Sequence, residues 1–214
     1  RRVVDNALRD FRLGGADLGD ADKARFKAVQ EDLASLSAKF DDNVLDSENA
    51  WAHYVDDAAG LAGVTADVVA TARAAAQAAG RDGYQLTLRY PCYMPVMQYA
   101  EDRELRALVH RAAATLASDL GASPDWENTR VIARILELRR EEAQLLGYAN
   151  YADLSLVPKM AQRPHEVLEF LRDLARRTRP FAERDYAELV DFARRKLGIE
   201  NVAAWDLQYA AEKL

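Results

Sequence analysis

His165 and Glu169 are the residues whose types and spacing come closest to a metal site. They lie in the run His165-Glu166-Val167-Leu168-Glu169, and on a helix residues four apart share a face. The run is not the His-Glu-x-x-His motif, because Glu169 stands where that motif has its second histidine. Catalytic zinc usually has three protein ligands, and no third partner is identifiable. Acidic residues in the first turn after Pro164 also stabilise a helix without any metal. We therefore assign no metal ligand here.

The other histidines and the cysteine give no catalytic pattern. His53 lies between Trp51 and Tyr54, and His110 lies in a segment of Leu and Ala. Neither has a Ser, Cys or carboxylate at a spacing that suggests a triad, so we interpret both as structural. Cys92, the single cysteine, has no evident histidine partner and behaves as a small hydrophobic residue. No catalytic or cofactor-binding residue is assigned, and no phosphate loop or dinucleotide fingerprint is present.

Two further groups of side chains have structural and functional interpretations. Adjacent carboxylates on a helix point about 100° apart and do not converge for acid–base chemistry, which favours solvated surface. These pairs are Asp41-Asp42, Asp56-Asp57 and Glu141-Glu142. Four tyrosines could line a peptide groove or simply pack a loop, and packing is favoured because aromatic rings bury large areas. They are Tyr84, Tyr90, Tyr93 and Tyr99.

The composition is that of a helical globular protein with an acidic balance. Half of the 214 residues are hydrophobic and 30% are charged, with only 10 Gly and 6 Pro. The net charge of -6 argues against general affinity for nucleic acid or anionic membranes. One cysteine allows no intrachain disulfide and fits a reducing compartment. No run approaches the ~20 apolar residues that span a bilayer, and no secretory signal is visible. Both ends of the chain look cut, which suggests an internal piece of a larger protein.

The elements that would position these residues are mostly long helices. Apolar residues at helical spacing predict one rod from Phe26 to Tyr54, with Asp20 or Asp22 as its cap. Thr65 is a candidate N-cap for a helix over Ala66–Ala79, which Gly80 ends. The alternation of residues 84–90 predicts a short strand. Pro91 and Pro95 predict an extended, aromatic-rich loop through Tyr99.

The second half predicts further helices. Asp102 can cap a helix through Leu116, and a broad apolar face predicts a buried helix over Thr129–Leu146 that ends at Gly147. A short helix follows over Tyr151–Leu156. Pro164 suits the first turn of a final long helix, which Pro180 should kink or split. We expect an all-α fold of long antiparallel helices in an irregular assembly, with one short extended segment near 84–99. That segment would join residues 1–83 to a helical bundle over 100–214.

Several stretches, in order along the whole chain, resemble the thimet oligopeptidase and oligopeptidase A family of zinc metallopeptidases. They are Asn6–Gly15, Phe40–Asp46, Pro95–Tyr99 with Arg103–Arg106, Leu138–Ala152, Lys159–Ala161 and Trp205–Tyr209. Each is a packing or turn pattern, and none carries chemistry. Two positions depart from the family pattern, since Leu116 stands where an arginine is expected and Ala210 where a second tyrosine is common.

The resemblance implies a helical body around a channel that admits short peptides, with zinc held by two histidines and a glutamate. Those ligands would lie C-terminal to Leu214, so the fragment is expected to bind no zinc and to be inactive alone. It would form non-catalytic channel wall, packed against the remainder of the same polypeptide, in a cytoplasmic enzyme. A dipeptidyl carboxypeptidase is the alternative within the family. A self-contained helical interaction module is the alternative outside it. A helical metal-carboxylate protein is rejected, because no histidine has Glu three residues before it.

Overall fold

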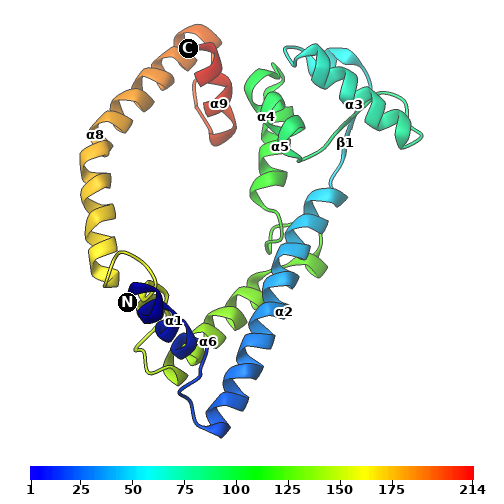
Figure 1. Ribbon diagram of the computed structural model, residues 1–214. Helices are drawn as coiled ribbons and strands as arrows, with labels where there is room; N and C mark the ends of the chain where they lie inside the picture. Colours follow the sequence, from blue (N-terminus) through cyan, green and yellow to red (C-terminus); the bar gives the residue numbers. More distant parts are fainter. The chain divides into compact units, whose positions relative to one another are not determined.

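The computed structural model describes all 214 residues and confirms the all-α fold (Figure 1). None of its helices has the length and apolar character needed to cross a membrane. The α-helices are α1 (Arg2–Leu13), α2 (Asp20–Ala50), α3 (Ala66–Ala78), α4 (Tyr90–Tyr99), α5 (Arg103–Ala114), α6 (Thr129–Leu145), α7 (Tyr151–Leu156), α8 (Pro164–Leu197) and α9 (Ala204–Lys213). Two 3₁₀ turns, η1 (Ala58–Leu61) and η2 (Pro124–Trp126), and the strands β1 (His53–Val55) and β2 (Tyr84–Leu86) complete the chain.

The chain divides into two compact units, each made of two segments. The first contains residues 1–42 and 128–177, and the second contains residues 43–127 and 178–214. These boundaries differ from the division at 84–99 that the sequence suggested. The reason is that α3 packs with β2 and α4, and α4 packs with α5 and α9, so residues before and after this segment share one unit. The segment near 84–99 therefore lies inside a unit instead of joining two.

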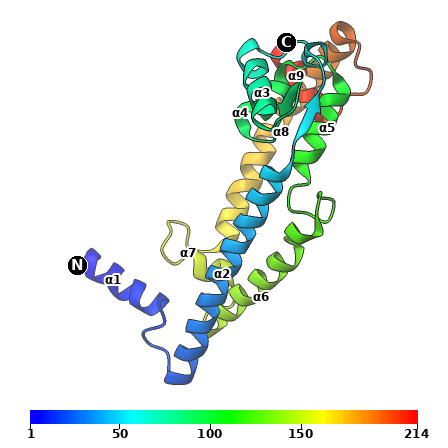
Figure 2. The same cartoon turned by 90° about the vertical axis from the view of Figure 1, so that its right-hand side faces the viewer.

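In the first unit, α2 and α6 lie side by side (Figures 1 and 2). Gln30 donates from Nε2 to Oε1 of Glu142 at 2.8 Å, and Asn128 donates from Nδ2 to the carbonyl of Phe40 at 3.1 Å. Val29 on α2 and Leu138 on α6 are fully buried. Apolar burial and hydrogen bonds along the seam thus hold the two helices together. The α6 and α7 helices also pack together, after the turn that Gly147 makes at a φ of +81°.

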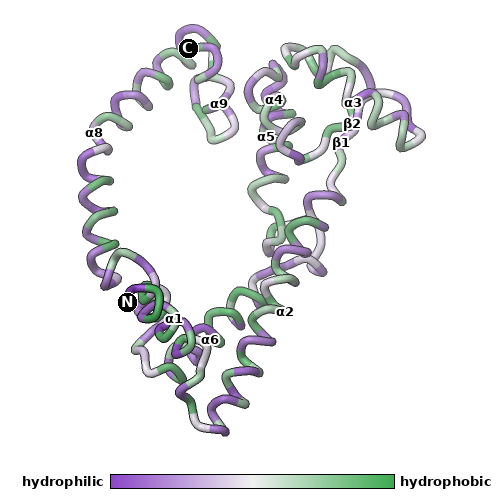
Figure 3. The backbone as a smooth tube through the Cα atoms, viewed as in Figure 1, coloured by the Kyte–Doolittle hydropathy of each residue, from purple (hydrophilic) through white to green (hydrophobic).

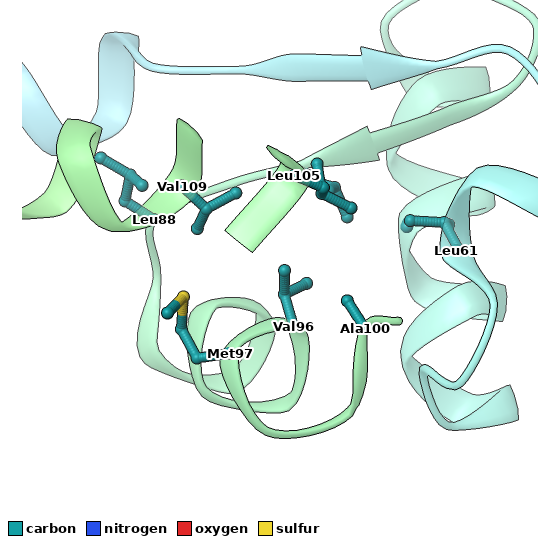
Figure 4. Close-up of a cluster of buried hydrophobic side chains, with 9 residues drawn as sticks. Leu61, Leu88, Val96, Met97, Ala100, Leu105 and Val109 are labelled. Carbon is teal, nitrogen blue, oxygen red and sulfur yellow. The ribbon is translucent and has the colours of Figure 1, made fainter. Parts of the chain in front are cut away.

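The second unit has a hydrophobic core between α3, β2, α4 and α5 (Figure 4). Its buried members are Leu61, Ala72, Leu86, Leu88, Val96, Met97, Ala100, Leu105 and Val109. The strands pair antiparallel, with His53 opposite Leu86 and Val55 opposite Tyr84. Gly83 turns toward this pairing at a φ of +85°, and a Cβ there would lie 2.4 Å from the carbonyl oxygen of Val55. Glycine is therefore required for the approach of the two backbones.

Several helix boundaries agree with the local signals. The Asp102 carboxylate caps α5, accepting from the backbone N–H groups of Glu104 at 2.9 Å and Leu105 at 3.1 Å. Thr65 is the N-cap residue of α3, and α7 spans the predicted residues. Asp20 and Asp22 lie in the first turn of α2 instead of capping it. The α8 helix begins at Pro164, as predicted.

The long helix α2 ends four residues before its predicted end. His53 and Tyr54 were expected on this helix, but they belong to β1. No Gly or Pro marks the end of α2, so the chain offers no local stop signal. Pairing with β2, about thirty residues away, decides the strand conformation. Such a long-range partner outweighs a weak local helical pattern.

The extended loop predicted over Tyr90–Tyr99 is wrong, because these residues form α4. Pro91 lies in the first turn, where the missing N–H costs no helical hydrogen bond. Pro95 removes one interior bond, but Val96 and Met97 beside it are almost completely buried. Their burial against the core offsets the cost of the proline.

The helix α8 runs through Pro180 without being split, and polar and apolar residues alternate along its length (Figure 3). Good helix formers surround the proline, which favours continuation of the helix on both sides. The short helix α9 was not predicted as an element of its own. Its N-terminus depends on Asp206, described below, whose partners lie about a hundred residues earlier in the chain.

Candidate functional site

The metal pattern that the sequence singled out is not assembled into a site. His165 and Glu169 both lie exposed in the first turns of α8. Glu166 between them accepts from the backbone N–H of Gln162 at 3.0 Å, which is a helix-capping contact. Nowhere in the chain do three or more His, Cys, Asp or Glu side chains gather closely enough to hold a metal ion. Zinc in the whole protein, and its absence from this fragment, therefore stay predictions.

The structure brings the other two histidines into the walls of one cavity, which we call the α5 cavity. It has a volume of about 950 Å³ and lies in the second unit, against β1, α5 and α9. His53 enters from β1 and His110 from α5, and the His110 ring meets the ring of Trp205 edge-on at 6.1 Å. The walls combine apolar side chains with acidic and basic ones.

Charged residues of α5 line this cavity at both ends of the helix. Asp102 and Glu104 lie at its N-terminus, and Arg111 lies in its last turn. Between them stands Leu108, which is 43% exposed. Thr115 also lines the cavity, but its Oγ1 donates to the carbonyl of Arg111 at 2.9 Å. The cavity thus offers binding groups of both signs around an apolar surface.

A buried ion network fixes α9 beside α5. The carboxylate of Asp206 is fully buried and accepts from Arg103 Nη2 at 2.8 Å and from Arg106 Nη2 at 3.0 Å. Arg106 is also buried and donates to the carbonyl of Ala100 at 2.6 Å, while its guanidinium lies 4.0 Å from the ring centre of Tyr209. Every charge in this cluster has a close partner, as buried charges require.

The Asp206 carboxylate accepts hydrogen bonds from three residues. Two are the side chains of Arg103 and Arg106, and the third is the backbone N–H of Ala203 at 2.9 Å, at the start of α9. Burial, the largest single influence, opposes its ionisation, but the hydrogen bonds from Arg103, Ala203 and Arg106 outweigh it and hold the pKa of Asp206 below its ordinary value. Because Trp205 precedes Asp206, the network also sets where this indole stands in the cavity wall.

The tyrosines separate into packing and surface residues. Tyr84 and Tyr93 pack against the core of the second unit, while Tyr90 is 73% exposed. The hydroxyl of Tyr99 donates to Oε1 of Glu212 at 3.0 Å, and this hydrogen bond raises the pKa of Tyr99. None of the four lines the α5 cavity. The four tyrosines therefore have different surroundings, and the packing role is supported for Tyr84 and Tyr93.

Two of the carboxylate pairs have specific partners. Glu141 forms a two-bond ion pair with Arg25, and this hydrogen bonding lowers the pKa of Glu141. Glu142 accepts from Gln30. Asp57 caps η1, accepting from the backbone N–H of Ala59 at 2.6 Å. Glu141 and Glu142 thus contact different groups and do not converge.

Reasoning from the sequence missed the ion network, and it named His53 and His110 only as structural residues, not as members of a shared cavity. Arg103, Arg106 and Asp206 were noted only inside stretches that carried the resemblance. Arg103 and Arg106, three apart on one helix face, were a signal for a shared acidic partner, but nothing local names Asp206. At the departures from the family pattern, Leu116 packs against the core and Ala210 is fully buried.

Comparison with known proteins gives the family. Residues 96–214 match Peptidase family M3. Over its whole length the chain is 44% identical to oligopeptidase A of Salmonella typhimurium and of Escherichia coli, and the matched region makes up 32% of each of these proteins. It is also 31% identical, over its whole length, to the dipeptidyl carboxypeptidase of Salmonella typhimurium, covering 31% of that protein. The chain thus spans about a third of the length of these relatives. The order of resembling stretches and the family match agree, and the chain belongs to peptidase family M3.

Proposed function

We propose that this chain is a non-catalytic, helical channel-wall portion of a zinc-dependent oligopeptidase that hydrolyses short peptides. The observation that carries the proposal is identity of 44% with oligopeptidase A over all 214 residues. That identity extends over helices and turns that contain no cluster of metal-binding side chains. We infer that zinc and its ligands belong to other parts of the whole protein. Likeness to a relative named a probable cytosolic oligopeptidase A supports a cytoplasmic location.

The remainder of the same polypeptide is the proposed partner of this chain. Large apolar side chains are exposed on α1 and on the first half of α8. They include Val3, Phe11, Leu168, Phe170 and Leu171. Monomeric proteins seldom leave so many large apolar residues open to water, which favours a covering segment. We therefore expect the isolated chain to self-associate, and sedimentation as a clean monomer at high concentration would count against this partner.

The test compares the 214-residue chain with the longer protein that contains it. Each is incubated with an internally quenched peptide, with zinc and with a chelator. We expect the longer protein to cleave the peptide, to lose activity with the chelator and to regain it with zinc, while the chain alone does not cleave. Zinc-dependent turnover by the pure chain would overturn its non-catalytic role. Absence of turnover by the longer protein would favour the alternative of a helical interaction module.

A second peptide separates the two activities within the family. The relative named dipeptidyl carboxypeptidase covers the whole chain at 31% identity, so this alternative has support of its own. An enzyme that removes dipeptides from the C-terminus must recognise a free carboxylate there. We expect the longer protein to cleave a peptide amidated at its C-terminus, as an oligopeptidase would. Cleavage only of the free acid would favour the carboxypeptidase.

A further inference from the structure

The α5 cavity carries unpaired charges of opposite sign at the two ends of one helix. Glu104 lies in the first turn of α5 and Arg111 in the last, and both line the cavity. Arg103 and Arg106 of α5 form ion pairs with Asp206, whereas Glu104 and Arg111 form none. Both of these side chains belong to exposed residues. Neither forms an ion pair within the chain, although the Glu104 charge also acts on the neighbouring Arg103.

An apolar surface open to solvent lies between the two charges. Residues 104, 108 and 111 are four and three apart, so they form one stripe along α5. Leu108 is the middle member, and Leu120, which is 68% exposed, lines the same cavity. Trp205 adds an aromatic face from α9. A ligand with an apolar or aromatic side chain would cover these residues.

The separation of the charges sets the size of the ligand. Seven residues along a helix rise about 10 Å between Glu104 and Arg111. An extended peptide advances about 3.3–3.6 Å per residue, so the amino and carboxyl ends of a tripeptide also lie about 10 Å apart. A dipeptide is too short to reach both ends of the stripe.

We propose that the α5 cavity binds a short zwitterionic peptide of about three residues. Its ammonium group lies toward Asp102 and Glu104, its carboxylate toward Arg111 and His110, and its central side chain over Leu108. The dipole of α5 opposes this orientation, because it places about half a positive charge at the N-terminus of the helix and half a negative charge at the C-terminus. The full charges of Glu104 and Arg111 exceed these partial charges. The peptide class rests on the proposed function, and the location and orientation are new to this inference.

The first test measures binding of Ala-Leu-Ala to the chain by isothermal titration calorimetry at pH 7 and low salt. We expect a dissociation constant between about 0.1 and 10 mM, as suits a small ligand with exposed charge contacts. N-acetylation or C-amidation should each weaken binding about threefold to fivefold, because each removes one charge contact. Equal affinity for the free and doubly blocked peptides, or no binding up to 10 mM, would overturn the proposal.

Two variants then locate the ends. Glu104→Gln should reduce the effect of N-acetylation, with Asp102 still in place, and should keep that of C-amidation. Arg111→Gln should reduce the effect of C-amidation and keep that of N-acetylation. The matched controls are Glu169→Gln and Arg172→Gln, exposed residues of α8 that form no ion pair and lie outside the cavity. If N-acetylation and C-amidation weaken binding to Glu104→Gln and Arg111→Gln as much as they weaken binding to the unaltered chain, the peptide binds elsewhere and the inference is refuted. These binding measurements need no turnover, so their failure is separate from failure of the longer protein to hydrolyse peptides.

Discussion

Removal of the Asp206 carboxylate is the perturbation with the largest expected effect on stability. In Asp206→Ala, the guanidinium of Arg106 stays buried with only carbonyl and ring partners, because it is 1% exposed. Breaking a buried pair by removing one partner costs about 3–5 kcal/mol. The start of α9 also loses its hydrogen bond to the N–H of Ala203, worth about 1 kcal/mol. We therefore expect the free energy of unfolding to fall by roughly 4–6 kcal/mol.

The measurement is urea denaturation followed by circular dichroism, with a matched variant as control. Asp191→Ala removes a carboxylate that pairs with Arg195 at 2.8 Å, the same distance as the pair of Asp206 with Arg103. Both side chains of the control pair are more than half exposed, so its loss should cost less than about 1 kcal/mol. Equal losses in the two variants would refute the argument that burial, and not distance, sets the value of the pair.

Two further predictions concern pH and one glycine. The pKa of Asp206 is lower in the folded chain than in the unfolded chain, where it is about 3.9. The ionised carboxylate therefore contributes its full stabilisation above the unfolded pKa, and this contribution is lost as the pH falls through the folded pKa. Stability measured from pH 6 to pH 3 should therefore fall less steeply in Asp206→Asn than in the unaltered chain, and parallel curves would contradict this assignment. Gly63→Ala should lose roughly 2–3 kcal/mol in urea denaturation, because φ is +84° and the new Cβ would lie 2.2 Å from the carbonyl oxygen of Tyr99. Gly80→Ala, at a φ of +70° with no atom within 4 Å, should lose only about 1 kcal/mol, and a loss as large as that of Gly63→Ala would refute the steric part of the argument.

Local signals in the sequence determined most of the helices. The carboxylate at Asp102 and the turn at Gly147 act within one helical turn of the boundaries that they set. The composition, poor in Gly and Pro, determined the all-α class. The family also followed from the sequence, because the order of short packing patterns is itself a property of the chain.

Only the tertiary structure decided the elements whose conformation depends on distant partners. Tyr90–Tyr99 is a helix because Val96 and Met97 are buried, although two prolines in the sequence argue locally against it. His53 lies in a strand because β2 supplies its hydrogen bonds.

The candidate site depends on distant partners in the same way. Asp206 meets Arg106 across a hundred residues of chain, and Trp205 beside it then enters the α5 cavity. Hydrogen bonds within a turn can be inferred from residue spacing, whereas burial and ion pairing depend on which segments the folded chain brings together.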